Sequence, residues 1–136
     1  MKTARLGLAI LVLGAALAAG EGSAHHSFAM FDRTKTMTFA GTVTEFQFTN
    51  PHSWLEVDAA AEAGTPAKHW SLEMNNLVGL RRGGWRPKTL VPGDKVTVSM
   101  HPMRDGSAAG QLMSVTTADG RILSGQGGNP GVPQND

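Results

Sequence analysis

The chain contains neither cysteine nor tyrosine. Without cysteine, disulfide bonds, thiol catalysis and a lipid anchor on a cysteine side chain are all excluded. The sequence also lacks a phosphate-binding loop and the G-x-S-x-G and H-E-x-x-H motifs, which are common signatures of nucleotide binding and hydrolysis. We therefore expect no covalent catalysis, and more generally a protein that is not an enzyme.

The one long apolar run lies at the N-terminus. Lys2 and Arg5 precede an apolar stretch over residues 6–19, and small residues follow as far as Ala24. This layout is typical of a secretory signal peptide, and the run is shorter than the ~20 residues that a membrane-spanning helix needs. We expect residues 1–24 to be a signal peptide and the mature protein to be periplasmic or secreted.

The position of the cleavage site stays open among three bonds. A cut after Ala24 leaves small residues at both recognition positions and makes His25 the new N-terminus. A cut after Ala18 would fall inside the apolar run, and a cut after Ser23 has less suitable neighbours. We favour the cut after Ala24.

A strong excess of charge of either sign is also absent. The net charge of the whole chain is +1, and loss of the signal peptide leaves equal numbers of acidic and basic residues. Binding to nucleic acid or to an anionic membrane surface therefore has no electrostatic support. We expect a metal ion, a small ligand or a protein as the partner, with no membrane insertion after processing; the oligomeric state is not predicted.

Apolar residues alternate with polar ones in five segments, which predicts five β-strands. The segments span residues 36–48, 52–59, 68–74, 95–103 and 111–117. In the first segment the alternation slips by one residue near Thr44 and Glu45, which predicts a bulge. Residues 75–84 predict a short helix, capped by Asn75 or Asn76 and ended by Gly83 with a positive φ.

Three strands, a short helix and two strands follow one another in the order of an OB-fold. We therefore predict an all-β fold, a five-stranded OB-like antiparallel barrel with the helix between the third and fourth strands. The barrel domain is expected over residues 36–123, after an N-terminal lead-in over 25–35. Residues 124–136 are rich in Gly, Pro, Gln and Asn and predict a disordered tail.

Several motifs together resemble a family of small exported bacterial proteins, the domain of unknown function 6152. The residues that carry the resemblance are AHHSF, GTVTEFQFTNPHSWLEV, HWSLEMNNLVGLRRGGW, LVPGDKVTV and SVTTADGR, which span most of residues 24–123. The resemblance implies a periplasmic β-barrel domain and no established activity. The predicted architecture is also similar, at the level of fold alone, to small periplasmic OB-fold proteins, some of which are copper chaperones.

His25 and His26 are the first candidate metal ligands. After a cut at Ala24, the α-amine and the imidazole of His25 can chelate Cu(II) together, and His26 adds a second imidazole. A copper site of this kind can also do redox chemistry, which leaves an enzyme as the less favoured alternative. A solvated N-terminus without a metal is the competing interpretation of the same two residues.

Four further residues extend the candidate site. His101 and Met103 offer an imidazole and a thioether, ligands that suit Cu(I). His52 and Trp54 share one face of the second strand, and His69 lies on the outer face of the third, so His52 and His69 meet only if the strand register allows it. We predict His25, His26, His52, His101 and Met103 as metal ligands, and Trp54 and His69 as a ligand-binding face.

Two functions follow from these residues. The first is an exported binding protein that holds copper through the N-terminal histidine pair. The alternative is a non-enzymatic adaptor or ligand-binding OB module that uses the Trp54 face without a metal. The carboxylates Glu56, Asp58 and Glu73, and the basic cluster of Arg81, Arg82, Arg86 and Lys88, are expected to be solvated.

Overall fold

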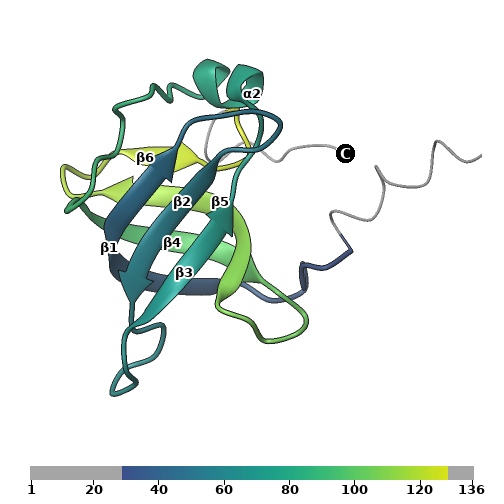
Figure 1. Cartoon of the computed structure of the whole chain (residues 1–136), viewed down its shortest axis with the longest axis vertical. Helices are drawn as coiled ribbons and strands as arrows, with labels where there is room; N and C mark the ends of the chain where they lie inside the picture. Colours follow the sequence, from purple (N-terminus) through teal and green to yellow (C-terminus); the bar gives the residue numbers. More distant parts are fainter. Residues whose placement is uncertain (1–28, 129–136) are drawn as a thin grey trace, which may run out of the picture. The chain divides into compact units, whose positions relative to one another are not determined.

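The computed structural model describes residues 29–128 (Figure 1). The chain divides into two compact units, residues 1–30 and residues 31–136. Of the first unit only Ala29 and Met30 are described, so the fold given below is that of the second unit. The predicted signal peptide, His25 and His26 lie outside the described residues, as do residues 129–136.

Six strands and one short helix make up the described chain. The strands are β1 (Met37–Gln47), β2 (Trp54–Ala59), β3 (Lys68–Glu73), β4 (Lys95–Pro102), β5 (Ala109–Thr117) and β6 (Ile122–Ser124), and the helix is α2 (Leu77–Arg82). This order confirms the predicted all-β fold with its helix between the third and fourth strands, and adds a short sixth strand. In residues 29–128, no helix has the length and apolar character that crossing a membrane requires.

The strands close into a barrel through two different kinds of pairing. β1 pairs with β2 and with β4, β2 pairs with β3, and β4 pairs with β5, all antiparallel. The ring is closed by β3 and β5, which run parallel where Ser71, Leu72 and Glu73 face Ala109, Gly110 and Gln111. The predicted five-stranded OB-like barrel is thus confirmed, and the pairing that closes it is parallel, while the others are antiparallel.

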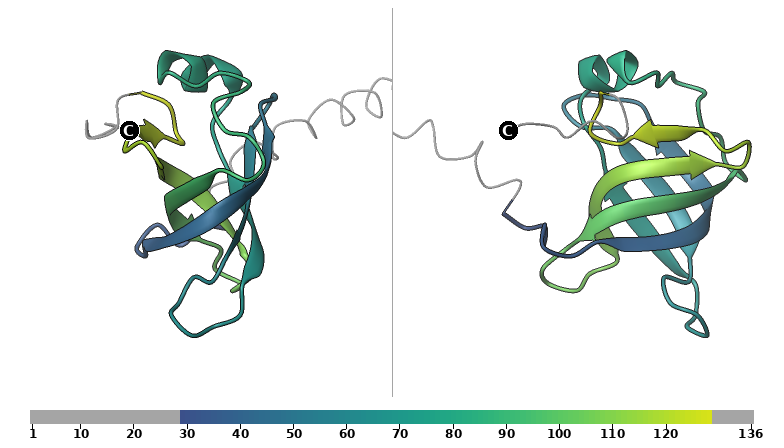
Figure 2. Two further views of the ribbon diagram at one scale, coloured as in Figure 1. Left: turned by 90° about the vertical axis from the view of Figure 1, so that its left-hand side faces the viewer. Right: turned by 180° about the vertical axis from the view of Figure 1, so that it is seen from behind.

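The bulge in β1 lies where the sequence predicts it. Val43 pairs with Val57 and Glu45 with Glu56, so Thr44 is the extra residue on the β1 side. A bulge bends the strand and increases its twist. The first part of β1 therefore pairs with β4 and its second part with β2, and one long strand serves both halves of the barrel (Figure 2).

One end of the barrel is covered by α2 and the loop that follows it (Figure 1). Leu80 and Trp85 are fully buried there, and the Trp85 ring packs at a tilt against Phe46 with centroids 5.3 Å apart. Arg86 Nη1 donates to the carbonyl oxygens of Arg81 and Trp85 at 3.1 and 2.7 Å, so its guanidinium satisfies one backbone acceptor in the last turn of α2 and one after the helix. Part of the basic cluster thus has a structural role.

The helix caps agree with the prediction at the start and differ at the end. Asn76 Oδ1 accepts a hydrogen bond from the Gly79 amide at 2.9 Å, which confirms an asparagine cap. Gly83 has a φ of −77°, and the positive φ falls on Gly84 instead, at 90°. The left-handed turn therefore comes one residue later than predicted.

Residues 124–128 are packed against the barrel, although the sequence places them in a disordered tail. The Asn75 amide donates to the Gly125 oxygen at 2.9 Å, and the indole Nε1 of Trp85 donates to the Ser124 oxygen at 2.8 Å. A Cβ on Gly127 would lie 2.7 Å from the oxygen of Gly79 in α2. We call residues 124–128 the C-terminal strap, since its glycines allow it to pass closely under the helix.

Replacing Gly127 should separate this close contact from the cost of a positive φ. Gly127 and Gly64 both have a φ of 80°, but a Cβ at Gly64 would meet nothing within 4 Å. Both Gly→Ala variants should lose about 1–2 kcal/mol of unfolding free energy to the backbone conformation. Gly127→Ala should lose a further ~1–3 kcal/mol to overpacking, measured by urea unfolding. Equal losses in the two variants would contradict the packing of the strap.

Candidate functional site

The outer faces of β2 and β3 carry a continuous set of polar side chains. The register pairs Trp54 with Glu73, Glu56 with Ser71 and Asp58 with His69. Side chains alternate between the two faces of a strand, so all six point away from the buried residues Leu55, Val57 and Leu72. We call these six residues the hairpin face: Trp54, Glu56, Asp58, His69, Ser71 and Glu73.

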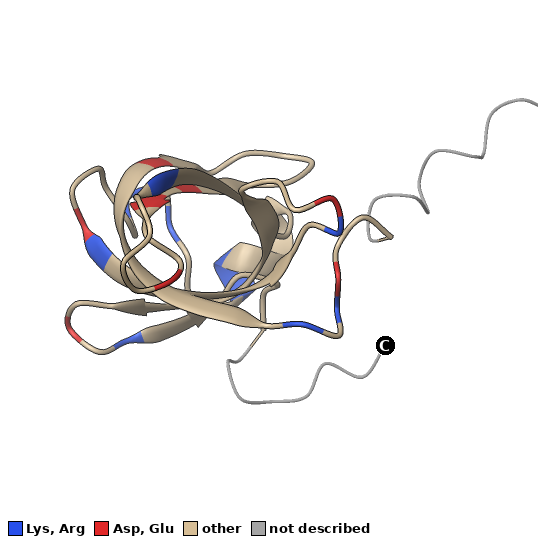
Figure 3. Ribbon diagram, turned by 90° about the horizontal axis from the view of Figure 1, so that it is seen from below, with Lys and Arg blue, Asp and Glu red and all other residues tan. Residues whose placement is uncertain are grey.

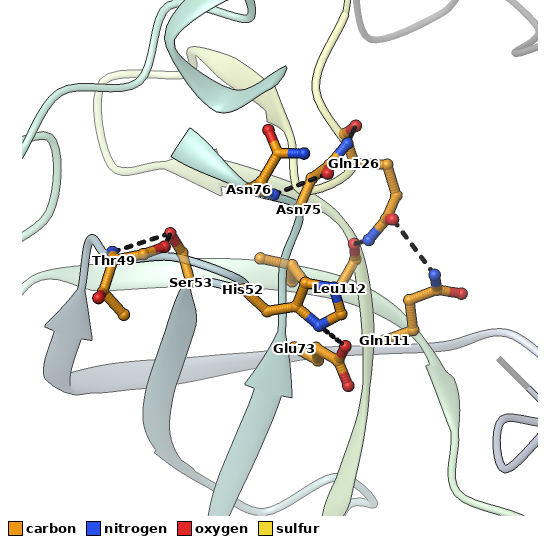
Figure 4. A network of polar contacts seen from close by, with 9 residues as sticks. All are labelled: Thr49, His52, Ser53, Glu73, Asn75, Asn76, Gln111, Leu112 and Gln126. Atoms are coloured by element: carbon orange, nitrogen blue, oxygen red, sulfur yellow. Dashed lines mark hydrogen bonds and ion pairs between the residues drawn. The ribbon is translucent and has the colours of Figure 1, made fainter. Parts of the chain in front are cut away.

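The loop between β1 and β2 positions His52 beside this face (Figure 4). The hydroxyl of Ser53 donates to the Thr49 oxygen at 3.0 Å and accepts from the Thr49 amide at 3.2 Å, which closes the loop on itself. Asn50 Oδ1 accepts from the Leu77 amide at 3.1 Å and so joins the loop to the start of α2. The sequence NPHS therefore forms a fixed turn rather than a simple interruption between strands.

His52 forms an ion pair with Glu73 through its Nδ1 atom. Glu73 is only 8% exposed, so the prediction of a solvated carboxylate is wrong at this position. A buried carboxylate needs a charged or hydrogen-bonding partner, and His52 provides it from the preceding loop. Because Nδ1 faces Glu73, Nε2 is the ring nitrogen of His52 that is left for another partner.

Two glutamines and an asparagine form a separate group of polar contacts next to Glu73. Gln111 is the register partner of Glu73 across the parallel seam. The side-chain Nε2 of Gln111 donates to Gln126 Oε1 at 3.2 Å. Gln126 Nε2 donates to the Leu112 oxygen at 2.8 Å, while the Gln126 backbone oxygen accepts from Asn75 Nδ2 at 2.5 Å. Gln126 of the C-terminal strap thus joins Gln111, Leu112 and Asn75 beside the His52–Glu73 pair (Figure 4).

His69 forms a second, more exposed cluster on the hairpin face. Its Nδ1 lies 2.9 Å from Asp58 Oδ1, and its Nε2 lies 3.1 Å from Glu56 Oε2. Ser71 donates to the other oxygen of Glu56 at 2.8 Å. The hydrogen bond with Asp58, and then the negative charge of Glu56, raise the pKa of His69 above its usual value.

The histidines of the barrel lie in separate surroundings. His69 and Glu73, the partner of His52, are four residues apart on β3, or about 13 Å along a strand. His101 on β4 has its Nδ1 at 2.7 Å from the Lys35 oxygen, and Met103 pairs with Phe31 in an isolated bridge. Within residues 29–128, no three or more His, Asp or Glu side chains form a group that could hold a metal ion.

The cluster around His69 should give a pH-dependent contribution to stability. Its pKa in the folded protein lies above the value of about 6.5 expected for the unfolded chain. The stabilisation is therefore complete below about pH 6.5 and is lost as the pH rises through the folded-state pKa. It should also weaken with salt, because the His69 side chain is 57% exposed.

NMR titration of the histidine ring checks this directly. Asp58→Asn should lower the His69 pKa, since it removes the main cause of the increase. Asp105→Asn, an exposed carboxylate in the loop between β4 and β5, is the matched control and should leave the His69 pKa unchanged. An unchanged pKa in Asp58→Asn would contradict the assigned cause.

Comparison with known protein families identifies a matching family. A family model described as a family of unknown function, DUF6152, matches residues 12–113. No curated protein matches the chain, and no solved structure does. The matched segment includes the NPHS turn, the whole hairpin face and α2, and it covers well over half of the chain. This protein therefore belongs to the DUF6152 family, as its motifs indicate.

Proposed function

We propose that this protein is an exported, non-enzymatic binding module whose ligand surface is the hairpin face around Trp54. One observation carries the proposal: a half-buried Trp54 stands directly opposite a carboxylate, Glu73, that is held in place by His52. OB barrels commonly bind their ligands on the face of strands two and three and with the loop between strands one and two. In this chain, those are the elements that carry Trp54 and His52.

The charge of the surface favours a cationic ligand group. The carboxylates Glu56, Asp58 and Glu73 outnumber the two histidines that pair with them, and Glu45 on β1, the register partner of Glu56, adds a further exposed carboxylate. Carboxylates pair with ammonium or guanidinium groups, and an indole ring attracts the same groups through cation–π contact. Phosphate groups would be repelled. The preferred partner is therefore a protein or peptide that presents Lys or Arg side chains.

The local hydrogen bonds favour binding over nucleophilic catalysis. The hydroxyl of Ser53 donates to the backbone of Thr49, and the hydroxyl of Ser71 donates to Glu56. Neither is hydrogen-bonded to a histidine, which is the arrangement that activates a serine nucleophile. The polar groups of this surface are instead engaged with one another, as expected for a rigid recognition surface.

Removing the Trp54 ring should weaken the binding of a basic peptide. We expect Trp54→Ala to reduce the affinity for a lysine-rich peptide about three- to tenfold, because a cation–π contact contributes about 0.5–1 kcal/mol at exposed sites and apolar contact is lost as well. Ile122→Ala on β6 is the matched control, since Ile122 is an exposed apolar residue outside the hairpin face. Isothermal titration at low salt gives the affinities. Equal affinity in both variants, or no binding to the parent protein, would exclude the Trp54 face.

Copper binding is the second candidate, and the orientation of His52 favours it. Histidines that bind metals usually donate their other ring N–H to a carboxylate, which fixes the ring and leaves one nitrogen free. Among the histidines of the barrel, His52 has this arrangement with Nδ1 on the buried Glu73, and His101 has a related one with Nδ1 on the Lys35 backbone oxygen. His69 has a carboxylate at each ring nitrogen, so it is less suited to a metal. The main ligands of this proposal remain His25 and His26.

Titration with Cu(II) and Cu(I), on protein whose N-terminus is verified by mass spectrometry, tests the second candidate. The double variant His25→Ala/His26→Ala should lose binding tighter than micromolar, and His52→Ala should weaken binding if its Nε2 contributes. His69→Ala is the control and should bind copper as the parent protein does. Binding that is weaker than micromolar in the parent protein, or unchanged in the double variant, would refute the copper proposal.

A further inference from the structure

A pocket of about 250 Å³ lies at the end of the barrel opposite α2. Its apolar lining includes Met37 at the start of β1, Trp70 on β3 and Met103 after β4. The loop between β2 and β3 and the loop between β4 and β5 form its sides. We call this pocket the barrel mouth. Figure 3 shows the ribbon from this end, with Lys and Arg in blue and Asp and Glu in red.

The mouth exists because the parallel seam between β3 and β5 is short. Pairing begins at Ser71 and Ala109, so the first residues of β3 have no partner in β5. Lys68 and Trp70 line one side of the resulting gap, and Gly106 and Ser107 line the other. The opening is thus a consequence of strand register.

The floor of the mouth is apolar and held in place. Trp70 is 7% exposed, its Nε1 donates to the Ala59 oxygen at 3.2 Å, and its ring packs at a tilt against Phe39 with centroids 4.9 Å apart. Since the indole N–H is already satisfied, the ring offers the mouth only an apolar surface. Together with the flexible thioethers of Met37 and Met103, it suits a small aliphatic side chain.

The rim of the mouth carries one charge of each sign. Glu62 lies in the loop between β2 and β3, and Lys68 begins β3. Both side chains are exposed, and among residues 29–128 neither forms an ion pair. A ligand that satisfied both would need an ammonium and a carboxylate close together, above an apolar body.

We propose that the barrel mouth binds a small zwitterion with an apolar side chain, the chemical class of the free aliphatic α-amino acids. The side chain lies against Met37, Trp70 and Met103, the ammonium faces Glu62 and the carboxylate faces Lys68. The pocket is somewhat smaller than the ~300–1,000 Å³ typical of drug-sized ligands, which limits the occupant to a single small molecule. This site is separate from the hairpin face, so its test does not depend on the function proposed above.

Methionine-methyl NMR with L-leucine as the probe tests the site. Leucine should shift the methyl signals of Met37 and Met103 and leave that of Met100, which is fully buried in the core, unchanged. Two analogues each lack one charge: 4-methylpentanoate has no ammonium and 3-methylbutylamine has no carboxylate. Each should bind about two- to fivefold more weakly than leucine, the range expected for one solvent-exposed ion pair.

Charge-neutral variants then assign each charge to its residue. Lys68→Met should weaken the binding of leucine two- to fivefold and leave the binding of 3-methylbutylamine, which has no carboxylate, unchanged. Glu62→Gln should weaken the binding of leucine two- to fivefold and leave the binding of 4-methylpentanoate, which has no ammonium, unchanged. Lys88→Met, which removes an exposed lysine outside the mouth, should change neither. The proposal is overturned if leucine leaves the Met37 and Met103 methyls unshifted. It is also overturned if the analogues bind as tightly as leucine, or if Lys68→Met lowers the affinities for leucine and for 3-methylbutylamine equally.

Discussion

The short parallel pairing between β3 and β5 is the contact on which the rest of the structure depends. It closes the barrel, and its register brings Glu73 beside Gln111, so that a carboxylate and an amide become neighbours across the seam. Because it spans only the last part of β3, it also leaves the opening that becomes the barrel mouth. One three-residue ladder thus determines both the polar network at one end of the seam and the apolar pocket at the other.

Most of the fold could be predicted from the sequence, because it is encoded in local patterns. The alternation of apolar and polar residues predicts the strands directly. A shift of this alternation by one residue near Thr44 indicates the bulge, because successive side chains point to opposite faces of a strand. The parallel seam leaves no such pattern, because it joins segments that are far apart in the chain. The C-terminal strap is also hard to predict from the sequence: its glycines indicate disorder, whereas Gly127 allows the chain to pass close to Gly79.

The candidate site was only partly predictable. The alternation of side chains along a strand assigns Trp54 and His69 to the outer face. It does not show which residues they contact, and these contacts determine the chemistry of the site. In the sequence, Glu73 does not differ from the other carboxylates on the strands. Only the structure shows that the loop between β1 and β2 brings His52 into contact with it. Gln111 and Gln126 carried no signal, since amide side chains have no distinctive spacing in a sequence. The pairs Asn50-Pro51 and Asn75-Asn76 were the available hints, as Asn50 joins the loop to the start of α2 and Asn76 caps the helix.

The strap has a consequence for where this domain can be cut. The family match stops at residue 113, within β5, and a boundary drawn from alternation alone stops at 123. A chain shortened to either point would leave the Trp85 indole without its acceptor and remove Gln126 from the network beside Glu73. The smallest piece that keeps these contacts must therefore extend at least through Gln126.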